Sequence, residues 1–124
     1  MLVEPQHPGN VGAVARVMAN FGCDELLLVG GCEIDDDAMA RAKAGRPLLE
    51  TARRIASLKE ALVETPVSVA TSGIVPKGDS RWQRAPHPVQ ELAGLLEGRE
   101  PALVFGRENH GLDRGELALC DLTI

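Results

Sequence analysis

Three polar residues, 108–110, stand in a row between Gly106 and Gly111, and they bring together a carboxylate, an amide and an imidazole. Four apolar residues, 102–105, come directly before them and predict a buried strand. The two glycines allow backbone conformations and close approaches that a side chain forbids. Polar groups at the carboxyl end of a strand are typical of a binding site in an α/β protein.

A second group of polar residues, Asn10 and Arg16, lies in the first predicted helix. Apolar residues recur there at helical spacing from Val11, and Gly22 is placed to end the helix at its C-terminal cap. Because residues 4–9 contain two prolines and a glycine, we expect them to form a loop, with Asn10 as the helix N-cap. Arg16 falls on a different stripe of the helix from the apolar residues.

Strands and helices alternate along the rest of the chain. The predicted strands are 2–3, 26–29, 67–71, 102–105 and 121–124, and the predicted helices are 11–21, 38–42, 47–52, 58–62, 88–96 and a short one that begins after Asp113. In helix 88–96 the spacing predicts that Val89, Leu92, Leu95 and Leu96 face inward. This alternation predicts an α/β fold with a mainly parallel sheet that carries helices on both faces. We expect residues 1–124 to form a single domain.

Composition and charge exclude several classes of protein. The net charge of −5 argues against a broad nucleic-acid surface, so any RNA contact should be local. No apolar run is long enough for a membrane span, and no signal segment is present, so we expect a cytoplasmic protein without a membrane. Three widely spaced cysteines favour neither a disulfide framework nor a zinc site.

Runs of charge have simple explanations. The acidic residues 35–37 complement the dipole of the helix that follows, so we expect no metal there. The basic groups at 41–46 and 53–54 are interpreted as solvated helix faces. Loop 74–86 carries Arg81, Trp82 and Arg84, and Trp82 could either stack on an unpaired RNA base or cover a sheet edge.

Two motifs together resemble one family. The segment Asn10-x-Gly12-x-x-Ala15-Arg16 resembles the first motif, and Phe105-Gly106-x-Glu108-x-x-Gly111-Leu112 the second motif, of the SpoU-like branch of the SPOUT methyltransferases. Residues 3–10 and 116–121 look closest to the TrmJ group of that branch, which methylates the ribose 2′-hydroxyl at the first nucleotide of the tRNA anticodon loop. The resemblance implies a C-terminal trefoil knot, a homodimer and S-adenosylmethionine as cofactor.

The resemblance also implies roles for individual residues. It places Asn10, Arg16 and Glu108 at the catalytic site, with Arg16 and Asn10 toward the target ribose and phosphate. The cofactor would lie against Thr71, Ser72, Gly73, Phe105 and Gly106, and the RNA against Arg16, Arg81 and Arg84. No metal is implied.

The sequence departs from the family after Ile124, where the third motif with its Ser-Leu-Asn stretch should begin. We therefore expect the 124 residues by themselves to be inactive, with most of the knot missing. The alternative is a non-catalytic RNA-binding or dimerisation module with the same fold. A Rossmann-type nucleotide site at residues 29–31 is disfavoured, because no Gly-x-Gly-x-x-Gly follows a strand.

The chemistry of methyl transfer limits what these residues can do. Arg16 stays protonated at neutral pH, so it is better suited to clamp a phosphate and stabilise a developing alkoxide than to act as a base. Asn10 could serve as a cap and as a site residue at once. For Glu108 the sequence leaves two roles open, a catalytic one and a structural one in which its carboxylate accepts hydrogen bonds from backbone amides.

Overall fold

Short parallel strands form the centre of the molecule. The computed structural model describes residues 1–73 and 87–124. Its strands are β1 (Leu2–Val3), β2 (Leu27–Val29), β3 (Arg53–Ile55), β4 (Ser68–Ala70), β5 (Ala102–Val104) and β6 (Leu122–Thr123). One sheet has the order β1-β2-β3 and the other β5-β4-β6, and every pairing within them is parallel.

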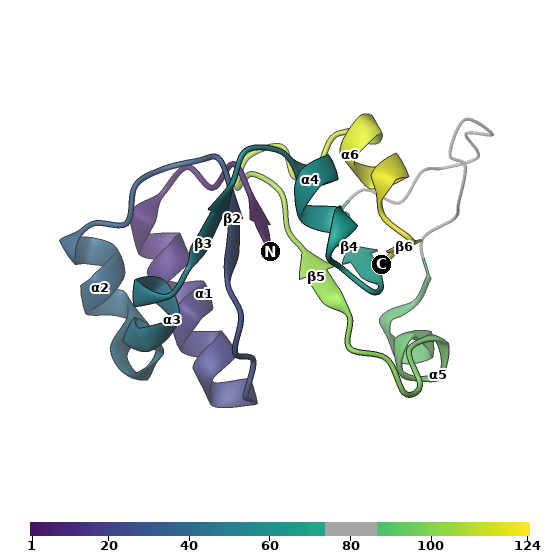
Figure 1. The fold of residues 1–124 in the computed structure, drawn as a ribbon, viewed down its shortest axis with the longest axis horizontal. Coiled ribbons are helices and arrows are strands. Elements are labelled where there is room, and N and C mark those ends of the chain that lie inside the picture. The colour runs from purple at the N-terminus through teal and green to yellow at the C-terminus, as the bar shows by residue number, and fades with distance from the viewer. Residues whose placement is uncertain (74–86) are drawn as a thin grey trace.

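A link between β1 and β5 joins the two sheets. Leu2 and Phe105 form a parallel bridge, in which the Val3 amide donates to the Phe105 carbonyl at 2.8 Å and the Phe105 amide to the Met1 carbonyl at 3.1 Å. The strands therefore run in the order β3-β2-β1-β5-β4-β6. This link brings the first and fifth strands, which are far apart in the sequence, side by side (Figure 1).

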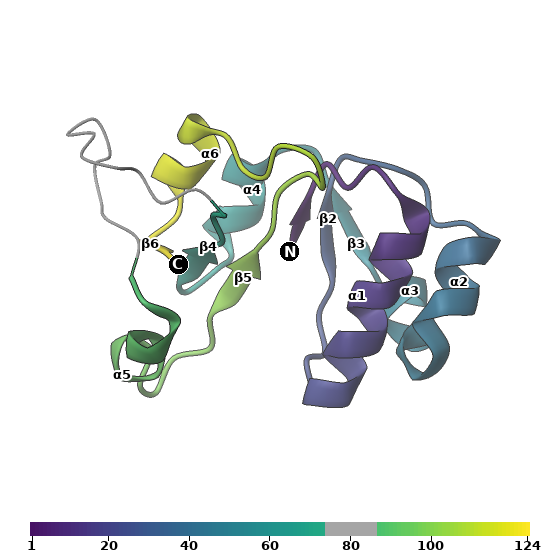
Figure 2. The ribbon, with the colours of Figure 1, turned by 180° about the vertical axis from the view of Figure 1, so that it is seen from behind.

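Helices pack on both faces of the sheet. They are α1 (Pro8–Phe21), α2 (Asp36–Ala42), α3 (Arg46–Glu50), α4 (Leu58–Val63), α5 (Leu92–Leu95) and α6 (Arg114–Leu119), with short 3-10 turns η1 (Lys43–Gly45) and η2 (Val89–Glu91). The side chains of α1, α2 and α3 form one core with Leu2, Leu26 and Leu28. Those of α4 and α6 form a second core with β1, β2, β4 and β5 on the opposite face. The α/β fold with a parallel sheet covered on both faces is confirmed (Figures 1 and 2).

Small residues let α1 pack closely against α2 and η1. A Cβ atom added to Gly12 would lie 2.2 Å from the Ala38 carbonyl oxygen, and one added to Gly45 would lie 2.3 Å from the Ala15 carbonyl oxygen. Gly12 and Ala15 both belong to the first motif. Part of that motif therefore serves helix packing rather than chemistry.

The start of α1 differs from the prediction. The helix begins at Pro8, with His7 as its N-cap, so the prediction that Asn10 is the cap is wrong. Proline suits the first turn of a helix, because its φ angle is already helical and its missing N–H would have no partner there. The helix ends as predicted, with Gly22 in the left-handed conformation at φ 71°.

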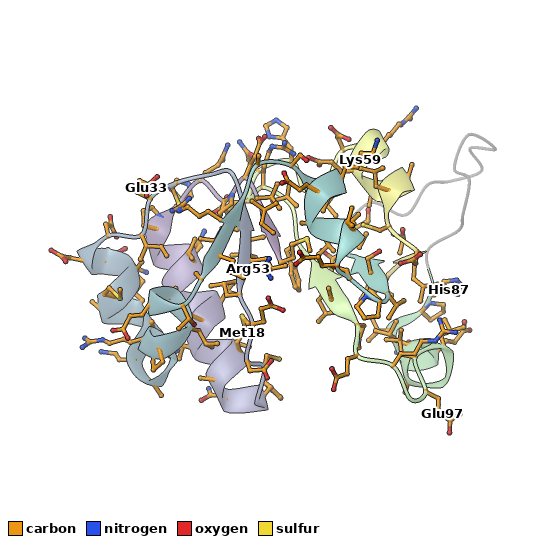
Figure 3. The ribbon with its side chains drawn as sticks, viewed as in Figure 1. Met18, Glu33, Arg53, Lys59, His87 and Glu97 are labelled. Atoms are coloured by element: carbon orange, nitrogen blue, oxygen red, sulfur yellow. The ribbon has the colours of Figure 1, made fainter. Side chains whose placement is uncertain are left out.

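The basic pair Arg53 and Arg54 lies in a strand, so its interpretation as a helix face is wrong. Within residues 1–73 and 87–124, β3 pairs only with β2, and charged side chains are common on such an edge strand. Arg53, labelled on β3 in Figure 3, donates to Glu25 at 2.9 Å and to Glu64 at 2.8 Å. Two adjacent arginines do not indicate a strand in the sequence, because the carboxylates that pair with Arg53 lie far from it along the chain.

The inward packing predicted for residues 88–96 is wrong for Val89 and Leu95, whereas Leu92 and Leu96 are half-buried. The segment divides into η2 and α5, and neither contains a buried residue. Val89 and Leu95 are exposed, although their spacing is that of an amphipathic helix.

On β5, Val104 is buried, but Leu103 and Phe105 point to the other face and are exposed, so the strand is buried on one face only. Loop 74–86 lies outside the described residues.

Gly12→Ala should lower the stability of the fold. The added methyl group would meet backbone atoms of α2, which cannot move aside as a side chain can, so we expect a loss of about 1–3 kcal/mol in the free energy of unfolding. Chemical denaturation would measure it. Gly94→Ala in α5 is the matched control, because a Cβ there meets nothing within 4 Å and should be neutral or stabilising by up to about 1 kcal/mol. Equal effects of the two substitutions would contradict the prediction.

Candidate active site at the carboxyl ends of the strands

The loops that follow β1 and β5 meet at one edge of the sheet. Because the strands are parallel and β1 lies beside β5, residues 4–7 and 106–111 leave the sheet side by side. The first loop leads directly into α1, which carries Asn10 and Arg16. The second loop carries Glu108. The two sequence motifs are thus brought together by the order of the strands.

Glu108 connects the two loops. Its carboxylate accepts hydrogen bonds from the Gln6 amide at 2.9 Å, the His7 amide at 3.1 Å and the Asn10 side-chain Nδ2 at 3.1 Å. These donors lie about a hundred residues away in the sequence. His7, the N-cap, has no side-chain cap of its own, and the carboxylate of Glu108 lies at that end of α1.

These hydrogen bonds keep Glu108 ionised. Burial acts to raise the pKa of Glu108, but the bonds from Gln6, its own backbone amide, Asn10 and His7 outweigh burial and lower the pKa to about 2. A carboxylate with so low a pKa carries almost no proton at neutral pH and is a weak base. The structure thus shows Glu108 making the backbone contacts of its structural role, with partners in the other motif rather than in its own loop.

Loop 106–111 is held tightly by its glycines. The Arg107 amide donates to the Gly111 carbonyl at 3.2 Å, and the Gly111 amide to the Arg107 carbonyl at 2.8 Å. A Cβ atom on Gly106 would lie 2.1 Å from the carbonyl carbon of Gly111, and Gly111 itself has a φ of 69°. The predicted need for glycine at both positions is confirmed.

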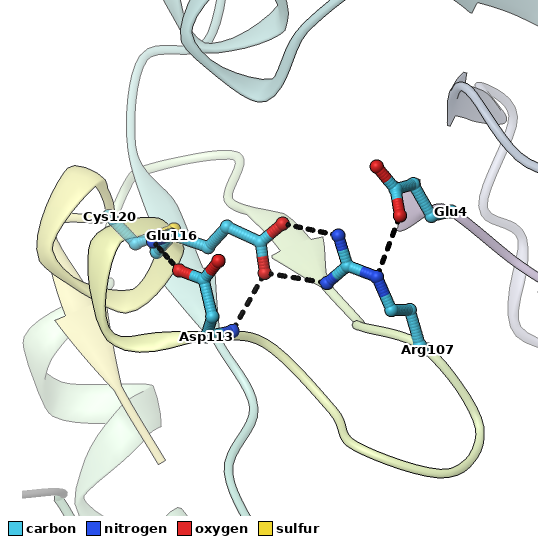
Figure 4. Close-up of polar contacts among 5 residues, drawn as sticks. All are labelled: Glu4, Arg107, Asp113, Glu116 and Cys120. Carbon is cyan, nitrogen blue, oxygen red and sulfur yellow. Dashed lines mark hydrogen bonds and ion pairs between the residues drawn. The ribbon is translucent and has the colours of Figure 1, made fainter.

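Arg107 is a site residue that the sequence does not indicate, yet its guanidinium donates three hydrogen bonds to two carboxylates. Its Nη1 and Nη2 donate to the two carboxylate oxygens of Glu116 at 3.0 and 3.1 Å, and its Nε donates to Glu4 at 2.7 Å (Figure 4). The bonds to Glu116 and Glu4 raise the pKa of Arg107. The spacing of Asp113 and Glu116 predicts the capping box that they form at the start of α6. It does not indicate that Glu116 also pairs with Arg107.

Asn10 and Arg16 differ in their surroundings. Asn10 is committed to Glu108, whereas the exposed side chain of Arg16 has no hydrogen bond or ion pair within the described parts of the chain. Neighbouring positions of α1, Ala15 and Gly12, face α2, which leaves Arg16 on the outer surface. Its guanidinium is therefore available to a ligand.

The residues expected against the cofactor lie at the ends of two adjacent strands. Thr71 follows β4 and donates through its amide and its Oγ1 to the Val104 carbonyl, at 3.0 and 3.1 Å. The Ser72 amide donates to the Ile124 carbonyl, and a Cβ on Gly73 would meet nothing within 4 Å among the residues that the structure describes. Phe105 and Gly106 follow the neighbouring strand β5. Arg81 and Arg84 lie outside the described residues.

Two classes of feature are absent from the parts of the chain that the structure describes. No cluster of three or more histidine, cysteine or acidic side chains could hold a metal ion. No helix among residues 1–73 and 87–124 is both long and apolar enough to cross a membrane.

The chain is similar to known methyltransferases along its whole length. The family model described as SpoU rRNA Methylase family matches residues 1–124. A tRNA (cytidine-2′-O-)-methyltransferase TrmJ from Methanocaldococcus jannaschii is 39% identical over 127 residues, which cover 100% of this chain and 55% of the relative. The chain spans about half the length of the curated relatives that it matches.

Solved structures share the fold. A probable methylase family protein from Haemophilus influenzae superposes with a TM-score of 0.85 at 29% identity, covering 98% of this chain and 52% of that one. The SpoU methyltransferase AviRb from Streptomyces viridochromogenes, solved in complex with AdoMet, has a TM-score of 0.69 at 23% identity and covers 98% and 47%.

Glu108→Gln should change how stability depends on pH. Because the native pKa of Glu108 lies below its ordinary value near 4.5, the native state binds fewer protons, and the carboxylate stabilises the fold fully above that pH. The difference in unfolding free energy between wild type and Glu108→Gln should therefore shrink as the pH falls from about 4.5 to about 2. Denaturation at a series of pH values would measure it, and a constant difference across this window would contradict the assignment.

Proposed function

Because the chain belongs to the SpoU methylase family, we propose that it carries the catalytic site of a tRNA ribose 2′-O-methyltransferase that uses S-adenosylmethionine. The observation that carries the proposal is the contact between Asn10 and Glu108, which joins the first and second motifs at the carboxyl edge of a parallel sheet. The M. jannaschii relative is named for this reaction on tRNA, and AviRb was solved with this cofactor.

The ends of β4 and β5 fit the cofactor. The exposed Gly73, the half-buried Thr71 and Ser72, and the exposed Phe105 before Gly106 lie at the ends of these two adjacent strands. We propose that these five residues hold S-adenosylmethionine. When bound, it supplies a methyl group on a sulfonium centre. The side chains of this chain then have to orient the acceptor and stabilise its charge.

Arg16 is proposed to bind the RNA next to the target ribose. A guanidinium keeps its proton at neutral pH, so Arg16 would clamp the adjacent phosphate and stabilise negative charge that develops on the ribose oxygen. Its lack of a partner in the described residues supports this role.

Asn10 and Glu108 are proposed to set the position of Arg16 at the site. Asn10 lies in the first turn of α1, and Glu108 accepts hydrogen bonds from Asn10 and from the two residues before the helix. Glu108 thereby fixes the direction in which the helix leaves the sheet. Positioning of the reactants is a large part of catalysis when the acceptor is weakly acidic. Glu108 therefore contributes as a fixed anion rather than as a proton acceptor.

The remaining expectations follow the family. We propose that residues 1–124 belong to one methyltransferase domain, that the protein forms a homodimer, and that it acts on tRNA in the cytoplasm. Exposed apolar side chains on α1 and β5 support the homodimer, because a second copy of the chain could cover them: Val17, Phe21 and Leu103. The third motif is not in the sequence, so residues 1–124 alone are expected to transfer no methyl group.

Methyl transfer by the complete gene product tests the proposal. Incubation with labelled S-adenosylmethionine and tRNA should label the tRNA, and nuclease mapping should place the methyl group on a ribose 2′-oxygen. Light scattering should give the mass of a dimer. Binding of tRNA without any transfer would favour the alternative, a non-catalytic RNA-binding or dimerisation module.

Arg16→Ala should remove activity without destabilising the fold. Loss of the charge that faces the reacting oxygen should lower kcat by about 100-fold or more, whereas an exposed, unpaired side chain should change the unfolding free energy by less than about 0.5 kcal/mol. Arg16→Lys should restore little, because an ammonium cannot make the bidentate contact. Activity within twofold of wild type in Arg16→Ala would contradict the role.

Arg81→Ala and Arg84→Ala should weaken tRNA binding. If the two arginines contact phosphates, each substitution should raise the Kd and reduce its salt dependence, with little effect on kcat at saturating tRNA. Filter binding at several salt concentrations would measure this. An unchanged Kd in the double variant would remove loop 74–86 from the RNA-binding surface.

A further inference from the structure

Arg107 joins three segments of the site. Its guanidinium forms a two-bond ion pair with Glu116 on α6 and a third bond to Glu4 in the loop after β1 (Figure 4). The side chains of Arg107 and Glu116 are only 21% and 15% exposed, so solvent and salt screen this pair less than a surface ion pair. Because the two-bond geometry fixes direction as well as distance, the pair sets the orientation of the loop.

Glu4 lies at a turn that the backbone does not adopt freely. Its φ is 46°, in the left-handed region, which is uncommon for a residue with a side chain. The following residue, Pro5, packs against Gly31, and its carbonyl accepts a hydrogen bond from the Cys32 amide at 2.8 Å. The loop after β2 thus supports this turn from one side, and the ion pair with Arg107 holds it from the other.

Arg107 and Glu108 bind the same loop through opposite charges. Arg107 holds the carboxylate of Glu4, and Glu108 holds the amides of Gln6 and His7 two and three residues further on. Residues 4–7 are therefore fixed at both ends. Since α1 follows at once, any shift of this loop moves Asn10 and Arg16.

We infer that Arg107 is a positioning residue: by holding Glu4 and Glu116 together, it fixes loop 4–7 and the start of α1 against the loop that follows β5. This inference rests on the proposed methyltransferase function and extends it to a residue with no contact to the reacting groups. Glu4 and Glu116 share this positioning role, because each supplies a carboxylate to Arg107.

Arg107→Gln in the complete gene product tests the inference by two independent measurements. Hydrogen exchange followed by mass spectrometry should show loss of amide protection in residues 4–10. The kcat for methyl transfer should fall about tenfold or more, with the KM for tRNA changing less than about threefold, because misplaced groups slow the reaction without removing an RNA contact. The matched control is Arg99→Gln, an exposed arginine with no ion pair among the described residues, which should change neither quantity.

Two further variants keep the test decisive if Arg107→Gln folds poorly. Glu4→Gln removes only the more exposed of the two ion pairs, so it should fold normally and still show faster exchange in residues 4–10 and a lower kcat. Arg107→Lys keeps the charge but not the two-bond geometry and should give intermediate values of kcat and exchange.

The outcomes separate this inference from the proposed function. Wild-type exchange in residues 4–10 of Glu4→Gln, or a kcat within twofold of wild type in both Arg107→Gln and Glu4→Gln, would overturn the positioning role. A wild-type protein that transfers no methyl group would instead contradict the proposed function. In that case the exchange measurement still decides whether Arg107 holds the loop.

Discussion

The carboxylate of Glu108 is the contact on which the site depends. It accepts two backbone amides and one side-chain amide from a segment about a hundred residues earlier, and these bonds outweigh burial and lower its pKa to about 2. A charged carboxylate at the first turn of a helix also interacts favourably with the helix dipole. One side chain thereby fixes the N-terminal end of α1, joins the two motifs and stays ionised at neutral pH.

Charge at the site is arranged so that one arginine stays available. The chain carries a net charge of −5, but the acidic groups around the site are engaged: Glu108 binds amides, and Glu4 and Glu116 bind Arg107. Arg16 is left without a partner among the described residues. A local positive group on an acidic protein suits recognition of a single phosphate better than binding along a nucleic-acid surface.

Packing and chemistry share the first motif. Gly12 and Ala15 allow α2 and η1 to lie against α1, while Asn10 and Arg16 on the same helix point away from that contact. A rigid helix is a good support for a side chain that has to be placed accurately. The spacing of the motif therefore reflects a packing face and a functional face of one helix, held in a fixed relation by the helical turn.

The sequence alone determined the features that depend on neighbours within one or two turns. The C-terminal end of α1 at Gly22, the capping box at Asp113 and Glu116, and the glycines at 106 and 111 follow from local backbone geometry, and the two motifs together indicated the family. The tertiary structure alone decided the strand at Arg53–Ile55, the exposure of Val89 and Leu95, and the ion pairs of Arg107. Each of these depends on a partner from a distant part of the chain or on whether another element covers the segment. The order of the strands supplies those partners, and no local pattern specifies that order.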